Sequence, residues 1–98
     1  MRVLIVKGYL ITAADTDEES IPQILGCEKG CIRITELRDG AVMYTDREAV
    51  QRKESPYNAY ASLVSCSRVY GPAVIAGRNR KDIPDSYFPL LEWNDLNE

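Results

Sequence analysis

The sequence of 98 residues contains no histidine, and this absence removes whole classes of chemistry. Imidazole is the usual general base near neutral pH and the commonest metal ligand, so most catalytic triads and most zinc hydrolase sites are excluded. No serine or cysteine lies in a recognisable nucleophile elbow or a glycine-rich turn. We therefore expect a protein that is not an enzyme and has no catalytic residues.

Long apolar runs are also missing. No stretch approaches the roughly 20 apolar residues that a membrane-spanning helix needs, so we expect no membrane partner. The first apolar run, residues 3–6, is interrupted by Lys7 and Gly8, and no small-residue cleavage site follows a proper signal-peptide core. These residues predict the first strand of a cytoplasmic protein.

The cysteines are too few and too widely spaced for a disulfide framework or a zinc site. There are three, an odd number, which favours reduced thiols. Cys27 and Cys31 are four residues apart and Cys66 is distant, whereas structural zinc sites need four ligands and usually show a closer pair. We expect small core side chains, no bound metal and no cofactor.

The sequence has fewer basic than acidic residues. Fifteen acidic residues against twelve basic ones give a formal net charge of -3. Phosphate binding normally depends on a basic surface, so direct nucleic-acid binding is disfavoured and a protein partner is favoured. The acidic run Asp15, Asp17, Glu18 and Glu19 lacks the ladder of a calcium loop and instead suits the positive end of a helix dipole.

What is present indicates a single α+β domain spanning residues 1–98. Ile21, Ile24 and Leu25 recur at the spacing of one helix face, and Gly26 ends the pattern. The alternation across residues 31–37, the Asp39-Gly40 pair and residues 42–45 then predict a tight hairpin.

Other segments add strands. Residues 3–6, extended as far as residue 12, predict one strand, and residues 71–77 predict a buried strand. Residues 57–70 predict a short helix or turn followed by extended chain. Pro89 is expected to interrupt a final helix and leave an apolar tail against the sheet. Together these segments predict a mainly antiparallel sheet of four to five strands, with one or two short helices packed on one face.

Five segments together resemble a known family: residues 2–6, residues 21–27, a hairpin ending in residues 44–48, residues 56–59 and residues 71–77. They are similar to small proteins grouped as the domain of unknown function 3846 family, and the resemblance covers most of the chain. Members occur in bacterial and phage genomes, often on mobile elements. The resemblance implies a small accessory protein of such an element and transfers no catalytic residues.

Aromatic and basic side chains supply the candidate binding residues. Tyrosines can stack on bases where they lie beside cations, and Tyr and Trp are favoured at protein interfaces. The candidates for ligand or partner binding are Tyr57, Asn58, Tyr60, Tyr70, Arg78, Arg80 and Trp93. Solvated turns and half-buried tyrosines are the simpler interpretation of the same residues.

Two functions from different classes follow. The first is a non-enzymatic accessory binding protein of a phage or mobile element. It inhibits a host protein, either a defence protein or one that binds nucleic acid, and makes contact through an acidic face and its Tyr and Trp residues. The second is a small pocket protein that sequesters or turns over a nucleotide-like ligand with Arg78, Arg80 and the tyrosines. A homo-oligomer with an architectural role is the third interpretation.

Overall fold

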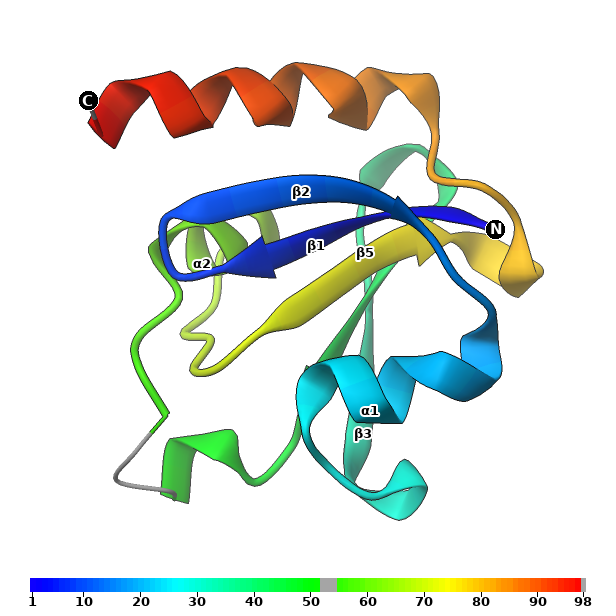
Figure 1. Cartoon of the computed structure of the whole chain (residues 1–98), viewed down its shortest axis with the longest axis vertical. Helices are drawn as coiled ribbons and strands as arrows, with labels where there is room; N and C mark the ends of the chain where they lie inside the picture. Colours follow the sequence, from blue (N-terminus) through cyan, green and yellow to red (C-terminus); the bar gives the residue numbers. More distant parts are fainter. Residues whose placement is uncertain (52–54, 98) are drawn as a thin grey trace.

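The structure, a computed structural model, describes residues 1–51 and 55–97 (Figure 1). Its centre is a five-stranded sheet in the order β2-β1-β5-β4-β3, and every neighbouring pair is antiparallel. The strands are β1 (Arg2–Lys7), β2 (Leu10–Asp15), β3 (Ile32–Glu36), β4 (Ala41–Asp46) and β5 (Ala73–Gly77). The α+β class and the mainly antiparallel sheet expected from the sequence are confirmed.

Two hairpins supply four of the strands. The β3–β4 hairpin is confirmed, and its turn places Asp39 and Gly40 at positive φ values of 61° and 78°. The single long strand expected over residues 3–12 is wrong, because the chain reverses at Gly8, whose φ is 54°. A β-rich run therefore divides into two paired strands, β1 and β2.

Helical segments lie on both faces of the sheet, whereas the sequence placed them on one face. The short helix α1 (Ile21–Leu25) covers one face, and α2 (Ala59–Ser65) with the long segment η6 (Asp85–Asn97) covers the other (Figure 1). The physical reason is the central position of β5, whose residues are all buried. An apolar strand of this kind needs cover on each side.

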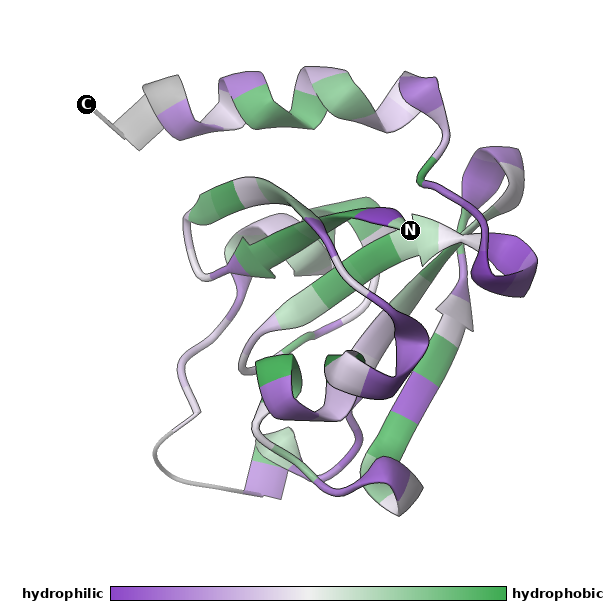
Figure 2. Ribbon diagram, turned by 45° about the vertical axis from the view of Figure 1, so that its right-hand side comes forward, coloured by the Kyte–Doolittle hydropathy of each residue, from purple (hydrophilic) through white to green (hydrophobic). Residues whose placement is uncertain are grey.

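The sheet thus separates two apolar cores. The hydropathy colours of Figure 2 show apolar residues along the strands of the sheet. Beneath α1, the core contains Val3, Ile21, Leu25, Val42, Tyr44, Val74 and Ala76. Beneath α2 and η6, the larger core includes Leu4, Val6, Met43, Tyr60, Ile75 and Tyr87, with Phe88, Leu90, Leu91 and Trp93 packed against it. The expected packing of the C-terminal apolar residues onto the sheet is confirmed.

The sequence also sets the helix ends. Asp17 accepts a hydrogen bond from the Ser20 backbone N–H at 2.8 Å and so caps the turn that leads into α1. Gly26, at φ 71°, ends α1 as expected. Residues 59–65 are helical, and the extended chain expected for the following residues reduces to one bridge between Tyr57 and Tyr70.

Pro89 does not end the last helical segment, which continues on both sides of it. An interior proline costs about 3 kcal/mol, but burying even two large apolar side chains returns about 3–6 kcal/mol. The segment therefore stays helical to keep Phe88, Leu90 and Leu91 against the sheet. Within the two described ranges, none of the helices has the length and apolar character needed to cross a bilayer.

Candidate functional site

Two of the predicted site residues, Tyr60 and Trp93, lie together between α2 and η6. The Tyr60 side chain is 5% exposed, its ring contacts the Trp93 indole edge-on with centroids 5.2 Å apart, and its hydroxyl donates to the Trp93 carbonyl. This arrangement satisfies a buried phenol. The pair fastens η6 to the rest of the fold and offers little surface to a ligand.

Asn58 is completely buried and forms the N-cap of α2. Its amide nitrogen donates to the carbonyls of Val6 and Gly71 at 2.8 and 2.9 Å, and its Oδ1 accepts from the Ala61 N–H at 3.1 Å. All of these bonds hold together β1, α2 and the segment before β5. The role of Asn58 in this arrangement is structural.

Tyr57 and Tyr70 remain accessible. Their rings meet edge-on with centroids 5.5 Å apart, and Tyr57 is 48% exposed. Both lie at the end of the sheet where β5 begins, since two residues separate Tyr70 from that strand. This aromatic pair is available to stack on a planar group.

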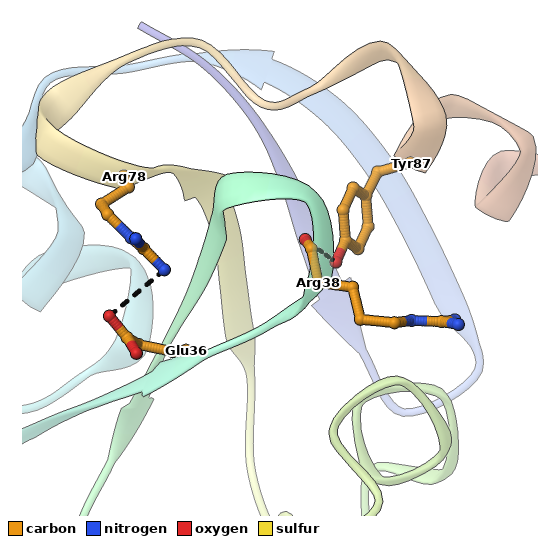
Figure 3. Close-up of polar contacts among 4 residues, drawn as sticks. All are labelled: Glu36, Arg38, Arg78 and Tyr87. Atoms are coloured by element: carbon orange, nitrogen blue, oxygen red, sulfur yellow. Dashed lines mark hydrogen bonds and ion pairs between the residues drawn. The ribbon is translucent and has the colours of Figure 1, made fainter.

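Arg78 and Arg80 lie at the other end of β5, and each faces a carboxylate. Arg78 pairs with Glu36 at 3.3 Å (Figure 3), and Arg80 pairs with Glu18. Five strand residues at about 3.4 Å each put about 17 Å between the two ends of β5. The structure therefore does not bring Arg78 and Arg80 together with Tyr57 and Tyr70.

A groove of about 540 Å³ lies between α1 and the edge strand β3, and we call it the α1–β3 groove. Its apolar floor consists of Ile21, Ile32, Ile34 and Tyr44. Ile34 is 59% exposed, although the alternation of residues 31–37 is typical of a strand whose apolar face is buried. The sequence did not indicate this groove, because the position of β3 at the sheet edge depends on the pairing of distant strands.

Carboxylates surround this side of the molecule. Asp17, Glu18 and Glu19 line the α1–β3 groove, and Glu28 and Glu48 line a neighbouring hollow. Among the described lining residues, the side-chain cations are Lys29 and Arg80, and Arg80 is already paired with Glu18. Met1, whose terminal ammonium donates to the Thr16 carbonyl, also lines the groove. Among the described side chains that line the two cavities, carboxylates therefore outnumber cations.

The cysteines do not form a common site. Cys27 and Cys31 line the same hollow beside α1, and Cys66 ends α2 on the other face of the sheet. Burial, followed by the nearby charges of Glu48 and Glu28, raises the pKa of the Cys31 thiol. In the part of the chain that the structure describes, no three His, Cys, Asp or Glu side chains are placed to hold a metal ion.

Comparisons with protein families, with curated proteins and with solved structures find no match for the chain. The resemblance to the domain of unknown function 3846 family therefore stays a prediction from sequence. Any functional proposal has to rest on the surfaces of the protein itself. Within the described ranges, accessible apolar or aromatic groups lie beside charged ones in the α1–β3 groove and at the end of the sheet that carries Tyr70.

Proposed function

We propose that the protein is a non-enzymatic accessory binding protein of a phage or mobile element, and that it inhibits a host protein by occupying a basic surface on it. The α1–β3 groove is the contact site. The observation that supports this function is the exposed apolar side chain of Ile34 beside the acidic residues of the groove rim. The mobile-element origin rests on the family resemblance alone.

The groove has the composition of a protein interface. An apolar centre with a charged rim is the usual arrangement, since the centre supplies affinity and the rim supplies orientation. Ile34 forms part of the floor of the groove, and Asp17 and Glu19 are exposed on its rim. A partner that places an apolar side chain over Ile34 and basic side chains beside Glu19 would match both the apolar centre and the charged rim of the groove.

The charge of the rim favours one class of partner. Proteins that bind nucleic acid carry basic surfaces, which attract an acidic protein and set the rate of association. Carboxylates beside α1 imitate phosphate charge on such a surface. The complete absence of histidine supports a binding role over an enzymatic one.

The proposal is tested by immobilising the wild-type protein and two variants and identifying host proteins retained from the natural host. We expect Ile34→Lys to lose the partner that the wild type retains, because a lysine cannot occupy the apolar contact. Leu63→Lys is the matched control, since Leu63 is 66% exposed on α2, on the opposite face. The purified partner is then titrated at increasing salt.

Inhibition by charge imitation requires that affinity fall as salt rises and that the protein displace nucleic acid from its partner. Affinity that does not change with salt contradicts the charge part of the proposal. Equal retention by Ile34→Lys and the wild type contradicts the groove as the contact site.

A further inference from the structure

A hollow of about 260 Å³ lies on the sheet face opposite to the α1–β3 groove, and we call it the arginine hollow. Its side chains come from β3, from the end of β4 and from the segment that connects α2 to β5. They include Arg33, Thr45, Arg47, Arg68 and Tyr70. The sequence pattern did not group these residues, since three separate segments supply them.

Strand pairing explains why two of the arginines, Arg33 and Arg47, line the same hollow. Arg33 lies directly opposite Thr45, and the Arg47 N–H donates to the Cys31 carbonyl at 2.8 Å. The ladder therefore continues past β4, and Arg47 is the diagonal neighbour of Arg33 on one face of the sheet. Diagonal neighbours in an antiparallel pair lie within reach of long side chains. Arg68 reaches the same hollow from the turn after α2.

The described side chains that line the hollow carry a net positive charge, three arginines against one carboxylate. Of the described residues that line the hollow, Asp46 is the one carboxylate, and its Oδ1 already accepts from the Glu48 N–H at 2.9 Å. Among the described residues, neither Arg33 nor Arg68 forms an ion pair. Like charges held close together repel, and a bound anion removes that repulsion.

The hollow has an aromatic wall as well. Tyr70 lines it, and the Tyr57 ring packs edge-on against Tyr70 and extends the aromatic surface into solvent. Hydroxyls of Thr45 and Ser67 add hydrogen-bonding groups beside the cations. Arginine forks suit phosphate oxygens, and tyrosine rings suit a base.

We propose that the arginine hollow binds a small phosphate-bearing ligand of the nucleotide class, with the phosphate between Arg33 and Arg68 and the base against Tyr70. Arg47 completes the cationic wall, and its Nη2 also donates to the Gly30 carbonyl at 2.9 Å, which fixes its orientation. The site lies on the other face of the sheet from the α1–β3 groove. Ligand binding at this site can therefore be tested independently of the proposed contact with a host protein.

Calorimetric titration with AMP, adenosine and inorganic phosphate tests the site on the purified protein without any partner. We expect AMP to bind more tightly than either fragment, because it alone supplies both groups. The double variant Arg33→Ala/Arg68→Ala should lose about a hundredfold in AMP affinity, from roughly tenfold for each charge-assisted contact. Both side chains are exposed, so thermal unfolding should show a folded variant.

The matched control is Arg78→Ala/Lys81→Ala, which removes two exposed cations at the far end of β5. It should bind AMP as the wild type does. The proposal is overturned if AMP does not bind at millimolar concentration, or if the Arg33/Arg68 variant binds it unchanged. It is also overturned if a single-stranded oligonucleotide binds through these arginines while AMP does not.

Discussion

The side-chain amide of Asn94 pairs with the backbone of Ile11 as a neighbouring strand would. Its Nδ2 donates to the Ile11 carbonyl at 2.8 Å, and its Oδ1 accepts from the Ile11 N–H at 2.8 Å. Ile11 belongs to the edge strand β2, and η6 lies alongside that strand. One edge of the sheet is thus partly closed by the C-terminal segment.

Replacing Asn94 with alanine should lower the free energy of unfolding by about 1–3 kcal/mol, because both backbone groups of Ile11 lose their partner. Chemical denaturation measures the change. Glu92→Ala is the control, since Glu92 is exposed on the same segment. Equal stability of the two variants would show that the Asn94 pairing contributes nothing.

Asn58 is the corresponding residue in the interior. Asn58→Ala leaves the Val6 and Gly71 carbonyls and the Ala61 N–H without their side-chain partner, and we expect a loss of about 3 kcal/mol. Tyr57→Ala, at the adjacent exposed position, should change stability far less. Thermal and urea unfolding of both variants provide the comparison, and similar losses would contradict the structural role of Asn58.

Much of the fold could be predicted wherever the signal was local. Strand alternation and an Asp-Gly turn predicted the β3–β4 hairpin. The spacing of the apolar residues and Gly26 predicted α1. The β1–β2 hairpin was missed, because the residues on both sides of Gly8-Tyr9 favour strand. A pair with glycine first occurs in type II′ hairpin turns, but a glycine between two such stretches equally permits a bend within one strand. Only pairing with β1 identifies residues 10–15 as a separate strand.

The candidate site was less predictable, because it depends on which segments meet. Asn58 and Tyr60 were chosen for their residue type, and tertiary packing buries both. Nothing in the sequence around Ile34 or Arg68 predicted that either residue would line a binding surface. Their importance arises from the edge position of β3 and from the turn after α2, and both follow from long-range pairing.

Gly77 should tolerate no larger side chain. A Cβ at this position would lie 2.2 Å from the Asp82 carbonyl oxygen and 2.8 Å from that of Lys81, so the backbone of the following turn would have to move. We expect Gly77→Ala to destabilise the protein by about 1–3 kcal/mol through this overpacking. Gly30→Ala is the matched control, because no atom lies within 4 Å of the added methyl group. Denaturation midpoints that fall equally would contradict the steric explanation.

Tyr87 makes the stability of the protein sensitive to alkaline pH. Its side chain is 7% exposed, and its hydroxyl donates to the Arg38 carbonyl at 2.7 Å (Figure 3). Burial, with a smaller contribution from Asp39, raises the pKa of Tyr87, and burial likewise raises the pKa of Tyr44. The folded protein therefore keeps these phenol protons to higher pH than the unfolded chain does.

The sign of the pH dependence follows from linkage. Below the ordinary tyrosine pKa of about 10, both states are protonated and the full stability is present. As pH rises, the unfolded chain loses its protons first, so the free energy of unfolding should fall until the folded-state pKa is passed. Urea unfolding of Tyr87→Phe at several alkaline pH values should show a smaller fall than the wild type, because Tyr44 still contributes. Tyr57→Phe, at a half-exposed ring, should retain the wild-type dependence, and an unchanged fall in Tyr87→Phe would show that this phenol is not its source.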